Sequence, residues 1–63
     1  MDEKTFNDLK VGDRVVCEYG SGATVIKTGI IDVHNKQPMV KLKPDVKKWA
    51  CNYFFRDELI SLE

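Results

Sequence analysis

The sequence has no long hydrophobic run, few cysteines and no excess of charge of either sign. No stretch of its 63 residues approaches the roughly 20 consecutive apolar residues that a membrane-spanning helix requires. The acids Asp2 and Glu3 near the start do not suit a secretory signal peptide, so we predict a cytoplasmic protein with no membrane partner. Ten basic residues balance ten acidic ones, which argues against a strong, purely electrostatic binder of nucleic acid.

The two cysteines, Cys17 and Cys51, are too few for a disulfide framework. We expect two buried or half-buried free thiols in a reducing compartment, or a disulfide if their strands face each other. Neither thiol has a second cysteine two to four residues away, and His34 is the only histidine, so the spacing of a zinc site is missing. The sequence also offers no nucleophile for which His34 would act as a general base. We therefore predict no catalytic residue, no metal site and no cofactor.

Length and composition favour one globular domain covering residues 1–63. The hydrophobic fraction of 43% is typical of folded domains and argues against disorder. A domain of this size buries only about 60% of the surface that its unfolded chain exposes. Nearly every apolar residue is therefore needed in the core.

Alternating apolar and polar residues predict short strands. In the third strand, Val40 and Leu42 point inward while Lys41 and Lys43 point outward. Gly29, in the middle of the long second strand, indicates a bulge or a sharp bend. Such a bend lets one strand serve both halves of a small barrel. The expected strands are about 13–19, 24–34, 39–43, 48–55 and 59–62.

Two alternation patterns assign faces less cleanly. In the second strand, Val25, Gly29, Ile31 and Val33 share one face, and Lys27 is a misfit on it. The fourth strand is apolar on both sides, so the pattern does not decide which side faces the core. The two alternatives are residues 49, 51, 53 and 55, or residues 50, 52 and 54.

The segments that flank the sheet are expected to be short turns. Phe6 and Leu9 lie three residues apart, so one helical turn would place both on the same side. We predict a turn or short 3-10 segment over residues 1–10, with these two side chains covering one open end of the core. Thr5 and Asp8 have the spacing of a weak capping signal. A single polar 3-10 turn is predicted at residues 56–58, before the last strand.

Five short strands, a glycine-bent second strand and a polar turn before the last strand resemble an SH3-like barrel. The resemblance is carried by VGDRV at 11–15, TGIIDV at 28–33, MVKLK at 39–43 and FFRDELISL at 54–62. The chain looks similar to the KOW, Tudor and related orphan barrels, some of which are stand-alone phage or plasmid accessory proteins. The resemblance implies an all-β binding module, because this fold hosts peptide, nucleic-acid and small-molecule binders alike.

The chain also resembles the plasmid-borne type II dihydrofolate reductases, which share this fold. GDRV at 12–15, Ser-Gly-Ala at 21–23 and Tyr53 match that family. The family's Val-Gln-Ile-Tyr active-site run falls on residues 50–53, where Tyr53 is the one retained residue. The lysine pair before the family's loop is replaced by Glu18 and Tyr19. A reductase is therefore a lesser alternative.

The favoured function is a non-enzymatic protein-interaction barrel, such as an inhibitor or accessory factor that docks on a larger partner. The aromatic side chains exceed what a barrel of this size can bury, and surplus aromatic residues commonly mark partner sites. We predict a partner-binding surface with Trp49 as its main anchor, formed by Tyr19, Trp49, Tyr53 and Arg56. An apolar patch for self-association or a partner protein is predicted at Val16, Ile26, Ile30 and Met39.

The alternative function is nucleic-acid binding, as in KOW barrels. Residues 34–48 hold five lysines against Asp45 alone, so the charge is unevenly spread along the chain. In this alternative, Trp49 or Tyr53 stacks on a base and Arg56 assists the lysines at the phosphates. The lysines that would contact phosphates are Lys36, Lys41, Lys43, Lys47 and Lys48. The same lysines also suit an ordinary solvent-exposed face, where they would prevent the sheet edges from pairing with another chain.

Overall fold

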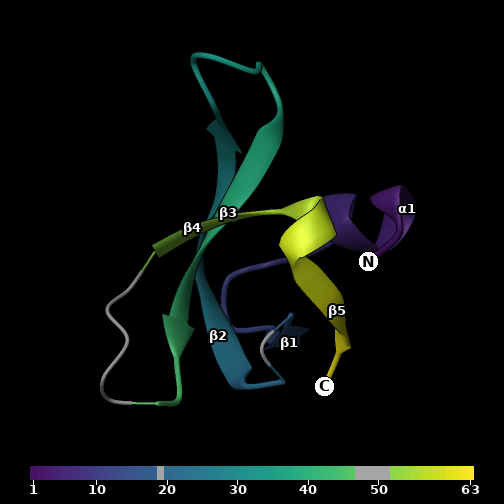
Figure 1. The fold of residues 1–63 in the computed structure, drawn as a ribbon, viewed down its shortest axis with the longest axis vertical. Coiled ribbons are helices and arrows are strands. Elements are labelled where there is room, and N and C mark those ends of the chain that lie inside the picture. Colours follow the sequence, from purple (N-terminus) through teal and green to yellow (C-terminus); the bar gives the residue numbers. More distant parts are fainter. Residues whose placement is uncertain (19, 47–51) are drawn as a thin grey trace.

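The dominant feature is one antiparallel sheet of five strands, seen in a computed structural model that describes residues 1–18, 20–46 and 52–63. The strands lie in the order β4-β3-β2-β1-β5, so β4 and β5 form the two edges of the described sheet (Figure 1). The predicted all-β class with five strands is thus confirmed. The strands are β1 (Arg14–Cys17), β2 (Gly22–Ile31), β3 (Pro38–Pro44), β4 (Asn52–Phe55) and β5 (Leu59–Leu62).

The N-terminal segment is a short α-helix, α1 (Glu3–Asn7), and not the predicted turn or 3-10 segment. The Phe6 N–H donates to the Asp2 carbonyl at 3.0 Å, which is the four-residue spacing of an α-helix. The cap is Asp2, whose carboxylate accepts the Thr5 N–H at 2.7 Å. The predicted role of the segment is confirmed, because Phe6 and Leu9 are buried at 4% and 6% exposure.

The core lies against one face of the sheet and combines alternate residues of all five strands with α1. Val40 and Leu42 are buried as the alternation predicts, and Phe54 at 6% exposure identifies the core-facing side of β4. The single polar turn is also confirmed as a 3-10 helix, η1 (Arg56–Glu58). The buried hydrophobic residues are Phe6, Leu9, Val15, Cys17, Ala23, Val25, Val40, Leu42, Phe54 and Leu59.

Two bulges interrupt β2 where it pairs with β3. Val25 lies opposite Leu42, Lys27 opposite Lys41, and Ile30 opposite Met39, so β2 has one extra residue in each interval. Gly29, in the second interval, has a φ of +72°. This left-handed backbone region is open to glycine at little cost and strained for a β-branched side chain. The predicted bend at Gly29 is therefore confirmed.

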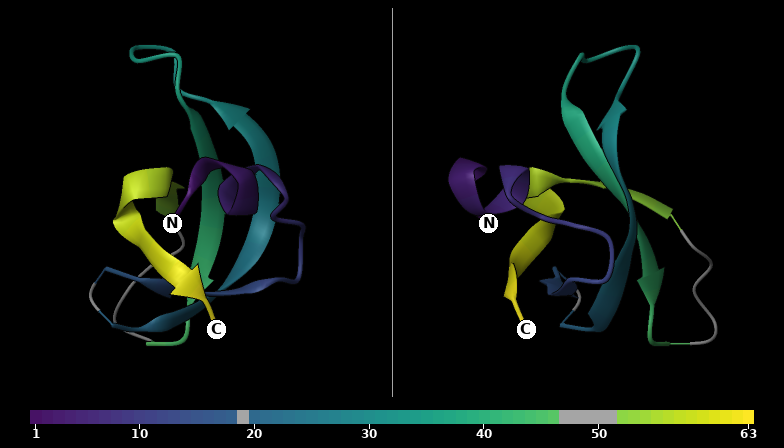
Figure 2. Two further views of the ribbon diagram at one scale, coloured as in Figure 1. Left: turned by 90° about the vertical axis from the view of Figure 1, so that its right-hand side faces the viewer. Right: turned by 180° about the vertical axis from the view of Figure 1, so that it is seen from behind.

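Beyond the second bulge the β2–β3 hairpin extends away from the rest of the sheet (Figures 1 and 2). Ile31 keeps the face of Val25 that the alternation predicts, because their partners on β3 are four residues apart. Ile31 and Val33 are nevertheless 57% and 82% exposed. The two bulges together add two residues, so the alternation is restored beyond Gly29. Ile31 is exposed because the hairpin extends past the rest of the sheet. β2 ends at Ile31, and the chain turns before Val33 can pair.

Arg14 joins three parts of the chain at the opposite end of β2. Its Nη1 donates to the Thr24 hydroxyl at 2.7 Å and to Asp45 Oδ1 at 2.8 Å, and its Nη2 to Glu63 Oε2 at 3.0 Å. A Cβ placed on Gly22 would lie within 2.5 Å of Glu63 and 2.8 Å of Asp45, so glycine leaves room for the cluster. The hydrogen bonds from Arg14 hold the pKa of Asp45 below its usual value.

The lowered pKa of Asp45 predicts a pH-dependent contribution to stability. Ionised Asp45 stabilises the folded state above the unfolded-state pKa, and this contribution is lost as the pH falls through the lower folded-state pKa. We expect Asp45→Asn to reduce the urea midpoint at pH 7, and the deficit to shrink below about pH 4. The effect should be modest and salt-sensitive, because the pair is solvent-exposed.

The matched control is Asp57→Asn, since Asp57 is 88% exposed and lies 3.7 Å from its basic partner. Its urea midpoint should equal that of the unaltered protein at every pH. A deficit of Asp45→Asn that is the same at pH 3 as at pH 7 would contradict a contribution from the ionised pair.

Candidate functional site

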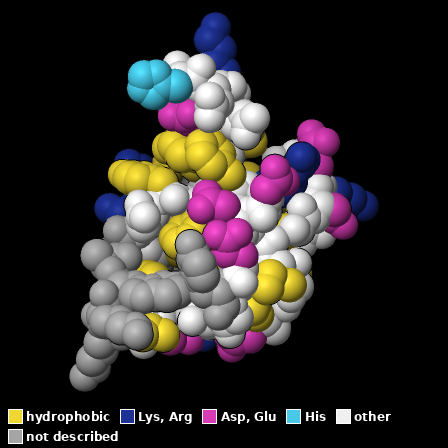
Figure 3. All heavy atoms as spheres, in the orientation of Figure 1, with side chains coloured by type: hydrophobic (Ala, Val, Ile, Leu, Met, Phe, Trp, Pro, Cys, Tyr) yellow, Lys and Arg dark blue, Asp and Glu magenta, His cyan; other side chains and the backbone are white. Residues whose placement is uncertain are grey.

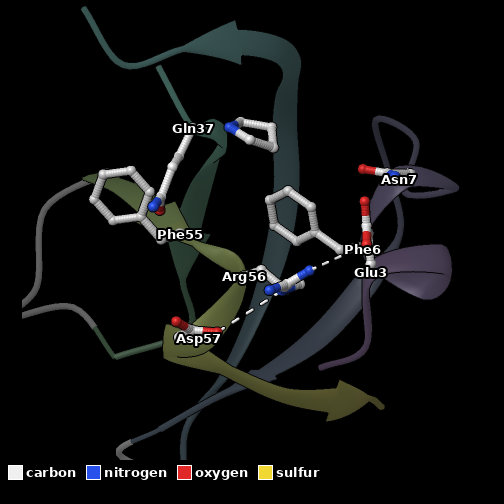
Figure 4. A pocket seen from close by; sticks show the side chains of 8 residues that line it. Glu3, Phe6, Asn7, Gln37, Phe55, Arg56 and Asp57 are labelled. Atoms are coloured by element: carbon white, nitrogen blue, oxygen red, sulfur yellow. Dashed lines mark ion pairs between the residues drawn. The ribbon is translucent and has the colours of Figure 1, made fainter. Parts of the chain in front are cut away.

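A cleft of about 350 Å³ opens where α1, the start of β3 and the β4–η1 junction meet. Its walls come from segments far apart in the sequence, and Figure 4 shows Arg56 between Glu3 and Asp57, with Phe6 close by. Two phenylalanines and a proline supply apolar surface, while the remaining lining residues are polar or charged. The lining residues are Glu3, Phe6, Asn7, Gln37, Pro38, Phe55, Arg56 and Asp57.

Arg56 is the cation of this cleft and is 42% exposed. Its Nη1 lies 3.7 Å from Glu3 Oε2, and its Nε lies 3.7 Å from Asp57 Oδ1. Both distances exceed those of hydrogen bonds, so the contacts are Coulombic and leave the guanidinium N–H donors to solvent or a ligand. The structure thus places Arg56, a predicted partner-binding residue, in a cleft with accessible donors.

The turn η1 holds Phe55 and Arg56 at the cleft. The Phe55 N–H donates to Glu58 Oε1 at 2.9 Å, which closes the single polar turn on itself. The Tyr53 N–H is likewise taken by Asn52 Oδ1 at 2.8 Å. With two of its backbone donors occupied by side chains, the β4 edge is poorly suited to pairing with an added strand. A partner that binds at this side of the molecule would therefore contact side chains and not the β4 backbone.

An apolar row leads from the cleft across the outer face of the sheet. Met39 lies opposite Ile30 on one side and Phe55 on the other, so one cross-strand row spans β2, β3 and β4. All three side chains are half-buried. Figure 3 shows hydrophobic side chains gathered below the tip of the β2–β3 hairpin, with acidic side chains beside them. We call the cleft together with the row Ile30–Met39–Phe55 the docking face.

A basic row lies beside the apolar row. Lys41 pairs with Lys27 across β2 and with Tyr53 across β4. Its Nζ lies 5.5 Å from the centroid of the Tyr53 ring, which is cation–π range. Tyr53 is 46% exposed, and Lys43 extends the same face of β3 two residues further on. We call Lys27, Lys41, Lys43 and Tyr53 the basic row.

Sequence reasoning brought together some members of these two surfaces and missed others. Tyr53 and Arg56 are predicted partner contacts. The pattern predicts either Phe54 or Phe55 as a further surplus aromatic without deciding between them, and it assigns the α1 residues to no site. Lys27 was missed as well, although its misfit in the alternation of β2 was the available signal. The first bulge turns Lys27 outward, opposite Lys41.

The remaining predicted site residues are separated or lie elsewhere. Lys36 is in the β2–β3 loop, where its N–H donates to the Asp32 carbonyl at 2.8 Å, and not on the strand with Lys41 and Lys43. The predicted contacts at Tyr19, Lys47, Lys48 and Trp49 lie outside the described residues.

The four residues predicted for self-association do not form one patch. Ile30 and Met39 face each other in the apolar row, whereas Val16 lies opposite Gly22, at the other end of β2. Ile26 occupies the first bulge between them and is 36% exposed.

Cys17 is a buried free thiol in the core, and burial raises its pKa. A raised pKa and the absence of solvent contact make a thiol unreactive. The predicted second thiol, Cys51, lies outside the described residues.

Comparisons with protein-family models, with curated proteins and with solved structures found no match for this chain. In the part of the chain that the structure describes, no helix is long and apolar enough to cross a bilayer.

Proposed function

We propose that the protein is a non-enzymatic binding module that docks on a larger protein partner through the docking face. One observation carries the proposal: a half-buried apolar row crosses three strands and runs into a cleft that holds a guanidinium with accessible donors. Aromatic residues, methionine and arginine are enriched at protein interfaces, and this surface combines Phe55, Met39 and Arg56. An inhibitor or accessory factor would act in this way, by occupying a surface of its partner.

We further propose that the sheet belongs to an SH3-like barrel. Three features support this assignment: the order β4-β3-β2-β1-β5, the pairing of β1 with both β2 and β5, and the 3-10 turn between β4 and β5. The bulged β2 supplies the bend that such a small barrel needs. In a barrel of this kind the docking face lies on the outer surface, where a partner can reach it.

Single-stranded nucleic acid is the second candidate partner, favoured by the basic row. Lys27, Lys41 and an exposed tyrosine stand side by side across three strands, which suits phosphate contacts combined with base stacking. This candidate ranks second because Glu3 and Asp57 in the adjoining cleft would repel phosphates and because the chain has no net positive charge.

The test is affinity capture from a cell lysate with four immobilised forms of the protein: unaltered, Phe55→Ala, Arg56→Ala and Ile60→Ala. Phe55 and Arg56 line the cleft. Ile60, which is 54% exposed on edge strand β5, is the matched control. We expect a protein retained by the unaltered and Ile60→Ala forms to be lost from the other two, with affinities at least about tenfold weaker.

Two controls make the outcome of the capture decisive. Urea unfolding of each variant separates loss of binding from loss of folding. Recovery of nucleic acid in place of protein, falling steeply as salt is raised, would contradict the proposal and support the second candidate. Equal retention of a protein by all four forms would also contradict it, because the docking face would then not be the contact surface.

A further inference from the structure

The basic row contains an electrostatic conflict. Lys27 and Lys41 lie directly opposite each other on β2 and β3, and like charges in such a pair destabilise a sheet. Among the described residues, ion pairs have only Arg14 and Arg56 as their basic partners, so no carboxylate there neutralises the lysines. Asp45, the acid that follows β3, is taken by Arg14. A bound anion would relieve the conflict.

The spacing of the two rows joins them into one surface. Met39 and Lys41 are two residues apart on β3, and Phe55 and Tyr53 are two apart on β4. Two residues of a strand span about 7 Å, so the basic row lies about 7 Å from the apolar row, and Lys43 lies about 7 Å further on. In an extended peptide segment, the side chains on one side also recur every two residues, about 7 Å apart. Such a segment can therefore place alternate side chains against successive rows.

The arrangement of apolar, basic and acidic side chains on this surface favours a peptide over a nucleic acid as the partner. A nucleic-acid strand would bring phosphates to the lysines, but it would continue either over the apolar row or toward Glu3 and Asp57. A peptide can instead present an apolar side chain where the surface is apolar and carboxylates where it is basic. The apolar row and the basic row are then both matched by one segment.

We propose that the docking face and the basic row together bind an acidic, apolar segment of a protein partner, an inference that rests on the proposed function above. The segment lies extended along β3 on the outer face of the sheet, with one large apolar side chain against Met39 and Phe55. Carboxylates two and four residues from this anchor lie against the Lys27–Lys41 pair and Lys43. The segment thus neutralises the conflict that the fold leaves open.

The test is selection of random dodecapeptides displayed on phage with the purified 63-residue chain as bait. We expect enriched peptides to carry Asp or Glu two or four residues from a large apolar residue. A synthetic enriched peptide should bind the double variant Lys27→Glu/Lys41→Glu at least about tenfold more weakly in fluorescence anisotropy. Lys10→Glu, which changes an exposed lysine in the segment after α1, should leave its affinity unchanged.

The remaining outcomes separate failure of this inference from failure of the proposed function. Enriched peptides without acids, lost with Phe55→Ala but unaffected by Lys27→Glu/Lys41→Glu, would overturn the acidic partner and leave the docking face intact. No enrichment over a Phe55→Ala/Arg56→Ala bait would overturn both. Tight binding of a thymidine oligonucleotide that is lost with Lys27→Glu/Lys41→Glu, without any selected peptide, would assign the row to nucleic acid instead.

Discussion

Replacing Leu42 by alanine is expected to remove a large share of the stability of the fold. Leu42 is fully buried at the centre of β3, opposite Val25. Truncation of a buried leucine to alanine costs about 2–5 kcal/mol, because the transfer free energy is lost and a cavity remains. A chain of 63 residues has a total unfolding free energy of only about 3–9 kcal/mol. Leu42→Ala should therefore lose a large share of its unfolding free energy, and its urea midpoint should fall accordingly.

Urea titration followed by far-UV circular dichroism measures this effect. Lys43→Ala is the matched control, since it shortens the neighbouring side chain of the same strand on the exposed face. We expect its midpoint to stay close to that of the unaltered protein. A loss of less than about 1 kcal/mol for Leu42→Ala would contradict a close-packed core around β3.

Replacing Phe6 by alanine should be as damaging, although Phe6 is not part of the sheet. It is the buried residue of α1 and closes one end of the core at 4% exposure. Phe→Ala changes in cores cost about 3–5 kcal/mol. A helix of five residues has no stability of its own, so loss of this contact should also release α1 and remove one wall of the cleft.

Two measurements on Phe6→Ala check both consequences. Urea unfolding gives the free energy, and amide hydrogen exchange of residues 3–8 reports whether α1 is still formed. Lys4→Ala, an exposed change on the same helix, should alter neither. Native-like stability of Phe6→Ala would mean that α1 contributes nothing to the core, and the cleft would then lack its fixed wall.

The candidate site was predictable only where its members follow from local pattern. Lys41 and Lys43 alternate cleanly with buried Val40 and Leu42, so their outward direction could be inferred from β3 alone. The role of Phe55 could not, because both sides of β4 are apolar and only packing against the core separates buried Phe54 from half-buried Phe55. The cleft was not predictable either, since Glu3 and Arg56 meet only in the folded chain.

The sequence by itself determined the features that depend on neighbouring residues. Alternation predicts five strands, the polar run Arg56–Glu58 predicts a 3-10 turn, and Gly29 predicts the bend of β2. Each follows from backbone preference or side-chain period, which are local properties.

Tertiary structure alone decided how these elements meet. The first bulge shifts the register of β2 against β3 and brings Lys27 opposite Lys41. Ile31 is exposed because the β2–β3 hairpin extends past the rest of the sheet. Register depends on pairing across strands, and a shift of one residue reverses which side chains face outward. Residues 3–7 form an α-helix because Asp2 caps it and Phe6 packs on the core. This packing places Glu3 beside Arg56.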